Sequence, residues 1–455
     1  MKLKSLLAVA TTLSLFTAMC STVASAATNG TSVPLTITGS NPVRGKTPIN
    51  VNIEKYTDEK TTKYRMRDME RHIWISGDDA INDYSLIVGL NPTKTEMQSD
   101  PNYLGKHCLA NLRINAASAT NKTFTQNCTS SWPNVALGVL NQVADAYDYY
   151  DIEFDWQGTD GNNAELFVNP YDRTGTYASC DLNYIAFGKS FSFDSNGNLL
   201  YDSQGKPVYE YHAKDFDAVV HEYTHRVTAN KVKWAASNQD SETACLNEAY
   251  SDIMAEYADS MDWKSLAGTT RNVTVKPKNG KYTFDDVVHY FDFNTYSKDK
   301  KTKSIDCHAG STILTCAAYL MDKKYNIPDS MAEDMWFTSM NNLTKGANKA
   351  TFANCRGAVI NALETVLKQY TSTSSAQKDK YRVAVRTAFN AVGVYGSHKL
   401  GDVNNDSKVD NKDVTLVQQY IAGLTSFDVE RRSLADVNFD GTISVSDAIT
   451  LYNLM

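Results

Sequence analysis

The spacing of hydrophobic residues changes once along this chain, and this change restricts the fold more than any other feature of the sequence. Between Val33 and about Val88, short runs such as Ile49-Asn50-Val51-Asn52-Ile53 alternate between apolar and polar residues, the pattern of half-buried strands. One amphipathic helix is predicted between Val135 and Tyr150, and from Asp215 to Val394 apolar residues recur at three- and four-residue steps. We therefore expect an α+β protein in which a β-rich half precedes a helical half.

The first residues have the features of a signal peptide rather than of a folded domain. Two lysines precede an apolar run from Leu6 to Phe16, and Ala24-Ser25-Ala26 supplies the small residues of a cleavage site. No later apolar run approaches the ~20 residues needed to cross a bilayer. We therefore expect a secreted, extracellular protein that is not a membrane protein.

Composition excludes several classes of protein. With 42% hydrophobic and 21% charged residues, the 455-residue chain can bury ordinary globular cores, so it is neither disordered nor collagenous. The formal charge of -7 comes without a block of consecutive basic residues, which argues against a nucleic-acid partner. Once Cys20 is removed, an odd number of cysteines remains, so at least one thiol is free or pairs with another molecule. Cys108 and Cys128 are candidates for a hairpin disulfide.

A metal-binding pattern lies at the start of the helical half, at His221-Glu222-Tyr223-Thr224-His225. Residues i and i+4 of a helix share one face, so both imidazoles can bind a single Zn²⁺ ion at ~2.0–2.1 Å. Glu222 projects from the same turn and can accept a proton from a water activated by the metal, then deliver it to a leaving amine. The motif alone is only moderately specific, because such a site needs a third protein ligand.

A second helical segment, Asn247-Glu248-Ala249-Tyr250-Ser251-Asp252, supplies the third ligand. Glu248 offers a carboxylate, and Asp252, one turn later on the same face, can hold an imidazole through its second N–H group. The two segments predict a site with two histidines, one glutamate and one open coordination position. We expect one catalytic zinc ion, bound by His221, His225 and Glu248.

These motifs, with Asp217 four residues before the first histidine and Thr228 after the second, resemble those of the thermolysin-like zinc metallopeptidases. The resemblance covers most of the chain from about Val33 to Val394, and it implies a two-lobed catalytic domain that acts as a zinc metalloendopeptidase. The segment that starts His308-Ala309-Gly310-Ser311 is similar to the family's active-site histidine segment, in which the histidine donates a hydrogen bond to the oxyanion. Glu222 and His308 are therefore the expected catalytic residues.

The same resemblance implies residues that surround the catalytic groups. Arg271 is the counterpart of an arginine that binds the substrate carbonyl, Asp306 orients His308, and Asn247 lies next to the glutamate ligand. The family's Asn-Ala pair on an edge strand binds substrate backbone, but the best match here is Tyr177-Ala178, which keeps the alanine and loses the asparagine. Structural calcium in the catalytic domain is implied at Asp217, Asp259 and Asp262.

The last part of the chain holds a near-repeat whose two copies start at Asp402 and Asp436, 34 residues apart. Each copy fits a twelve-residue calcium loop, with side-chain oxygens at positions 1, 3, 5 and 12 and a backbone carbonyl at position 7. Ser407 stands at the turn position that Gly441 fills in the second copy, so we expect weaker calcium binding in the first. The expected ligands are Asp402, Asn404, Asp406, Lys408 and Asp413 in the first loop, and Asp436, Asn438, Asp440, Thr442 and Asp447 in the second.

The repeat resembles a type I dockerin, a small all-α module that binds two calcium ions and docks secreted enzymes onto cohesin domains of a cellulosome-like scaffold. We expect a signal peptide (1–26), a β-rich lobe ending in the zinc helix (27–230), a helical lobe (231–396), a linker (397–400) and the dockerin (401–455). Because the linker is short and passes few contacts, we expect the peptidase and the dockerin to act independently.

Two functions are compatible with these features. The first is a secreted zinc endopeptidase that cleaves peptides or proteins and is held on a scaffold or at the cell surface by a cohesin. The second is a peptidase-like body without activity that serves as a calcium-dependent docking or binding subunit, which the lost asparagine favours. We favour the first because all three ligands, Glu222 and His308 are present.

Overall fold

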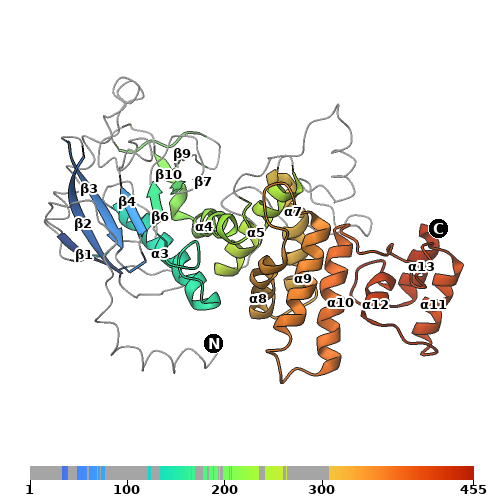
Figure 1. The fold of residues 1–455 in the computed structure, drawn as a ribbon. Coiled ribbons are helices and arrows are strands. Elements are labelled where there is room, and N and C mark those ends of the chain that lie inside the picture. The colour runs from blue at the N-terminus through green and yellow to red at the C-terminus, as the bar shows by residue number, and fades with distance from the viewer. Residues whose placement is uncertain are drawn as a thin grey trace.

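The computed structural model describes most of residues 33–76, residues 121–123 and 134–164, much of 166–234, residues 241–259 and 263, and all of residues 307–455. Figure 1 shows a sheet at one end of the described chain, a group of helices in the middle and a small helical unit at the other end. The expected signal peptide and the expected Cys108–Cys128 disulfide lie outside the described residues.

The strands form an eight-stranded mixed sheet in the order β5-β1-β2-β3-β4-β6-β8-β7, with β7 at one edge. Strands β1 to β4 pair antiparallel in sequence order, whereas β6 pairs parallel to both β4 and β8. Strands β9 and β10 form a separate antiparallel pair. The bounds are β1 Val33–Thr38, β2 Ile49–Asp58, β3 Thr61–Asp68, β4 Ile73–Ser76, β5 Asn121–Thr123, β6 Leu166–Asn169, β7 Ala178–Asp181, β8 Tyr184–Phe187, β9 Lys189–Phe191 and β10 Tyr209–Tyr211.

Helix α3 (Asn134–Phe154) connects the sheet to the metal-binding segment. It contacts β4 on one side and helix α4 (Phe216–Lys231) on the other, and its apolar residues at three- and four-residue steps are buried, as predicted. Arg71, in the turn between β3 and β4, binds Asp148 of α3 with an Nε–Oδ1 distance of 2.6 Å. The sheet and α3 together form the support against which α4 is held.

Five further helices form what we call the helical domain, and they confirm the helical prediction for the described residues after Asp215. Three of their N-termini are capped by the side chains of Ser241, Thr351 and Ser374; for example, Ser241 Oγ accepts a hydrogen bond from the Ala244 amide at 3.1 Å. One buried cluster runs from the sheet through this domain to Val394. The bounds are α5 Glu242–Ala258, α7 Cys307–Tyr319, α8 Asp329–Ser339, α9 Phe352–Val366 and α10 Ser375–Ala391, and a π-helical turn, η4 Leu320–Lys324, follows α7.

Among the described helices, none combines the length and the apolar character that a transmembrane span requires.

Residues 400–455, which we call the C-terminal unit, hold three helices: α11 (Asn411–Ile421), α12 (Val429–Ala435) and α13 (Val445–Leu454). They enclose their own small core, in which Val403, Val417 and Leu451 are fully buried. We call residues 402–413 the first loop and residues 436–447 the second loop. Each loop runs directly into the first turn of a helix, α11 or α13, so the loop and the helix N-terminus are built from the same residues.

The expectation of few contacts between the C-terminal unit and the helical domain is wrong. Helix α12 packs against α10, as Figure 1 also shows. Arg386 Nε lies 3.0 Å from Glu430 Oε2, and Asn390 Nδ2 donates a hydrogen bond to the Ser433 carbonyl at 3.0 Å. A short linker holds the two surfaces next to each other, which lowers the entropic cost of pairing them and favours contact over independence.

Candidate metal centre

Helix α4 positions the histidine pair of the predicted motif. Its apolar residues Val219, Val220 and Tyr223 are completely buried, which fixes the rotation of the helix about its axis. The remaining face turns His221 and His225 toward α5, where they are 4% and 8% exposed. The Thr224 hydroxyl donates to the Val220 carbonyl at 2.7 Å and lies 2.6 Å from the Tyr150 hydroxyl of α3, which further fixes this turn.

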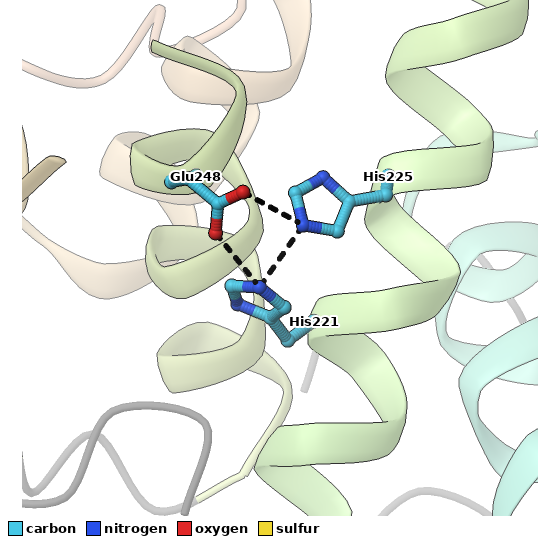
Figure 2. Close-up of side chains that lie close together, drawn as sticks. All are labelled: His221, His225 and Glu248. Carbon is cyan, nitrogen blue, oxygen red and sulfur yellow. Dashed lines mark hydrogen bonds and ion pairs between the residues drawn. The ribbon is translucent and has the colours of Figure 1, made fainter. Parts of the chain in front are cut away.

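The two imidazoles converge on one carboxylate of α5. His221 Nε2 and His225 Nε2 are 3.0 Å apart, and Glu248 brings Oε2 to 3.3 Å from the first and Oε1 to 3.5 Å from the second. Figure 2 shows the three side chains pointing toward one another between the two helices. The structure therefore brings together the three residues that the sequence predicted as zinc ligands.

These distances fit a tetrahedral metal ion. Ligand atoms about 2.0–2.1 Å from a zinc ion lie ~3.3 Å from one another, and the three observed separations bracket that value. Either a metal ion or a proton between the two Nε2 atoms removes the repulsion of their lone pairs. The nitrogen and carboxylate donors are also those that zinc prefers.

The second nitrogen of each histidine also has a partner on α5. His221 Nδ1 lies 3.0 Å from Asp252 Oδ1, and His225 Nδ1 lies 3.1 Å from Ser251 Oγ. Such contacts hold an imidazole ring in place and direct Nε2 toward a metal. The sequence analysis named Asp252 for this purpose but gave no role to Ser251, although Ser251 belongs to the same motif.

Charge at the centre is arranged for a cation. Burial alone would lower the pKa of His221, but hydrogen bonds with Asp252 and Glu248 outweigh it and raise this pKa to about 10. Burial opposes ionisation of Glu248, yet the nearby His225 and His221 lower the pKa of Glu248 well below its usual value. Without a metal, His221 therefore carries a proton at neutral pH, and a metal that binds its Nε2 must displace that proton.

Glu222 lies in the same turn of α4 and is 8% exposed. Burial raises the pKa of its carboxyl above the ordinary value, although the charges of His225 and His221 lower it. A carboxylate with a raised pKa next to a metal position is suited to accept and return a proton near neutral pH.

His308 and Cys307 also lie near Glu248, at the start of α7. His308 Nε2 is 3.5 Å from Glu248 Oε2, and its side chain is 52% exposed, so it is accessible from solvent. Cys307 Sγ lies 3.7 Å from His308 Nδ1, and ligand atoms of Glu248, Cys307 and His308 are within 4.8 Å of one another. The sequence analysis missed Cys307. Its position directly before His308 could have identified it as a residue near the site.

The other residues expected near the site differ in where they lie. Asn247 Oδ1 accepts a hydrogen bond from the Thr228 hydroxyl at 2.5 Å, which ties α5 to the C-terminal turn of α4. Ala178 begins the edge strand β7, which contacts α4, and it is half-buried against the core. Outside the described residues lie Tyr177, Asp262, Arg271 and Asp306.

Two of the three expected calcium carboxylates of the catalytic domain, Asp217 and Asp259, are among the described residues. Asp217 lies in the first turn of α4 and Asp259 follows the last residue of α5. Within the described part of the chain, neither belongs to a group of side chains with metal-ligand spacing.

The two C-terminal loops fold the same way. Asp413 Oδ1 accepts hydrogen bonds from the Val403 and Asn404 amides at 2.8 and 3.0 Å, and Asp447 Oδ1 accepts from the Val437 and Asn438 amides at 3.1 and 3.3 Å. The carboxylates at position 1 likewise accept from the backbone at position 6, Asp402 from Ser407 at 2.9 Å and Asp436 from Gly441 at 3.0 Å. These bonds wrap each loop around its carboxylates.

The second loop has the stronger features of a cation site. Ligand atoms of Asp436, Asp440 and Asp447 lie within 4.8 Å of one another. Asp436 is 1% exposed, and its Oδ1 has no hydrogen-bond donor among the described residues. Burial and the charge of Asp447 raise the pKa of Asp436 to about 7. A buried carboxylate oxygen without a donor is costly, and a hard cation such as Ca²⁺ would satisfy it.

Comparison with known proteins adds two matched regions and several distant relatives. Residues 235–394 match the family described as thermolysin metallopeptidase, alpha-helical domain, and residues 400–455 match the dockerin type I domain. The chain is 22% identical over 278 residues to the neutral protease NprE of Bacillus pumilus, which covers 61% of this chain and 81% of that protein. Bacillolysin of Bacillus subtilis (strain 168) is also 22% identical over 278 residues, but this match spans only 47% of its length. A solved precursor of protealysin, a metalloproteinase from Serratia proteamaculans, is 17% identical, covers 58% of this chain and 80% of that chain, and has a TM-score of 0.39.

Proposed function

Because residues 235–394 carry the helical domain of a thermolysin-like metallopeptidase and residues 400–455 carry a type I dockerin domain, we propose that this chain is a zinc-dependent endopeptidase that docks onto a cohesin-bearing scaffold. The observation that carries the peptidase proposal is the convergence of His221, His225 and Glu248 within ligand distance, with Glu222 in the same helical turn.

In this proposal the three ligands hold one zinc ion and the remaining groups handle the proton and the substrate. Bound there, Zn²⁺ would supply Lewis-acid stabilisation of the charge that develops on the scissile carbonyl and would make water a better nucleophile. Glu222 takes the proton from the attacking water and delivers it to the amine that leaves. His308 donates a hydrogen bond to the carbonyl oxygen as it becomes negative. Asp252 and Ser251 keep the two imidazoles oriented.

We also propose that the substrate backbone lies along strand β7. An edge strand offers unpaired N–H and C=O groups, so an extended peptide can pair with it. Strand β7 is at the edge of the sheet and contacts α4, which supports this path. Ala178 would allow close approach of the substrate, and Arg271 and Asp306 are proposed to bind the substrate carbonyl and to orient His308.

Zinc content and casein hydrolysis test the peptidase proposal in one experiment. We expect the purified chain to contain about one zinc ion at the centre, to degrade casein, to lose this activity to a zinc-selective chelator and to regain it when zinc is returned. A protein that holds zinc but leaves casein and small peptides intact would instead be the docking or binding subunit without activity. The intact set of ligands, Glu222 and His308 supports the active enzyme.

The docking proposal rests on the C-terminal unit. The hydrogen-bond pattern that the two loops share supports calcium binding in both. In the second loop, Asp436 Oδ1, which accepts no hydrogen bond from the described residues, supports it further. Helices α11 and α13 line an open groove of about 430 Å³ with apolar side chains, several of which are well exposed. Exposed apolar groups of this kind suit a protein partner. They are Ile421, Val445, Ile449 and Tyr452.

Binding to an immobilised type I cohesin tests this second half of the proposal. We expect retention of the full chain in calcium and release by a calcium chelator, because the loops lose the cations that hold their carboxylates together. Ile449→Asp should weaken retention at least tenfold, since it places a charge in the groove, whereas Ile152→Asp on the exposed face of α3 should not. If retention on the cohesin changes neither when calcium is removed nor in the Ile449→Asp variant, the dockerin assignment is contradicted. Export through residues 1–26 would bring the enzyme to such a scaffold.

A further inference from the structure

A phenylalanine of the second loop packs into the helical domain. Phe439 stands at position 4 of this loop, where the first loop has Asn405. Asn405 is exposed, whereas Phe439 is only 7% exposed. The Phe439 side chain belongs to the buried cluster of the helical domain and not to the core of the C-terminal unit. The two loops therefore differ in their surroundings even though their backbones match.

The backbone at this position does not favour phenylalanine. Asn405 has φ 62° and Phe439 has φ 60°, so both adopt the left-handed conformation. Asparagine tolerates that conformation, and a bulky side chain does not. The contact with the helical domain, rather than the shape of the loop, accounts for the phenylalanine.

The helical domain contributes matching groups just after α7. The Tyr325 hydroxyl donates a hydrogen bond to the Phe439 carbonyl at 2.9 Å, and the Tyr325 ring lies 3.5 Å from where a side-chain carbon on Gly441 would begin. Lys324 lines the cleft of about 530 Å³ between the two parts together with Asp436 and Asp440. The helical domain thus contacts the second loop through the Tyr325 ring and hydroxyl, and the positive charge of Lys324 faces the same cleft as the loop carboxylates.

We infer that the second loop is an internal interface, through which a cation bound by its carboxylates stabilises the helical domain, while the first loop has no such effect. This inference rests on the proposed calcium binding. A ligand that binds only the folded form raises the stability of whatever folds with it. Because Phe439 and Tyr325 join the second loop to the helical domain, ordering of that loop by calcium also orders this contact.

The tryptophans of the chain allow the effect to be measured in the full-length protein. The last tryptophan is Trp336, which is buried in the helical domain, and the C-terminal unit has none. Thermal unfolding followed by tryptophan fluorescence therefore reports on the part of the chain before the C-terminal unit and not on the two loops. With zinc held constant, we expect millimolar calcium to raise the Tm of this transition by about 3 °C or more.

Matched variants separate the two loops and the interface. Asp436→Asn should abolish the calcium-dependent rise in Tm, and the equivalent Asp402→Asn in the first loop should keep nearly all of it. Phe439→Asn copies Asn405 and should reduce the rise to less than half, although calorimetric titration still detects calcium binding. Tyr325→Phe, which leaves both loops unchanged, should also reduce it.

The outcomes distinguish this inference from the calcium proposal beneath it. Absence of calcium binding by the wild-type chain in the titration would overturn both. Calcium binding without a rise in Tm, or an equal rise in the Asp436→Asn or Phe439→Asn variant, would overturn the inference alone and leave the dockerin proposal intact.

Discussion

Glu222→Gln is expected to lower kcat/KM for peptide hydrolysis by about a thousandfold or more while zinc remains bound. The substitution removes the group that is proposed to carry the proton from water to the leaving amine, and general acid–base catalysis typically contributes 10²–10⁴-fold. It leaves His221, His225 and Glu248 unchanged. Hydrolysis of a fluorogenic peptide, with zinc measured in the same sample, checks the prediction.

Folding should not suffer in this variant. Burial raises the pKa of Glu222, which means that the folded protein disfavours its charged form, so a neutral glutamine of the same shape costs no stability. Glu153→Gln, on the exposed face of α3, is the matched control and should keep full activity. Near-normal turnover by the Glu222→Gln protein would rule out the assigned proton transfer.

Glu248→Ala is expected to weaken zinc binding by well over a hundredfold and to abolish activity at ordinary zinc concentrations. It removes one of the three proposed protein ligands and the carboxylate that faces both imidazoles. Asp252→Asn is the matched comparison, because it spares every proposed ligand and alters the partner of His221, for which a 10–100-fold loss is typical. Competition with a zinc-binding dye gives the affinities.

Zinc affinity of the wild-type centre should also depend on pH. The pKa of His221 is raised to about 10 without metal, so below that pH zinc must displace a proton. Between about pH 7.5 and 8.5 the affinity should therefore rise about tenfold as pH rises. Unchanged zinc affinity in Glu248→Ala, or a flat pH profile in the wild type, would mean that zinc binds elsewhere.

Features encoded within a few residues were predictable from the sequence. The four-residue spacing of His221 and His225 puts both on one face of α4, and the apolar residues around them decide which face is buried. The calcium-loop pattern is also local, because its acidic positions and the helix cap share one short segment. Glu248 was found through its own motif, although its approach to the histidines depends on how α4 and α5 pack.

Features that depend on packing between distant segments were not predictable. The contact of Ser251 with His225 was missed, although the neighbouring Asp252 was predicted to hold an imidazole, because this contact follows from the crossing of α4 and α5 and not from either segment alone. Cys307 comes near Glu248 only because α7 lies against α5. Phe439 would be taken for an exposed loop residue, since nothing near it in sequence indicates that Tyr325 and the helical domain cover it.

The burial of Phe439 limits the use of residues 400–455 as an interchangeable cassette in protein engineering. Fused to another enzyme, the segment would expose this ring to water and keep its left-handed backbone, whose strain of ~1–3 kcal/mol no longer has a compensating contact. A transplant should therefore carry asparagine at position 439, as the first loop does at its equivalent position. Conversely, a foreign docking cassette placed after this helical domain would leave a hydrophobic gap beside Tyr325.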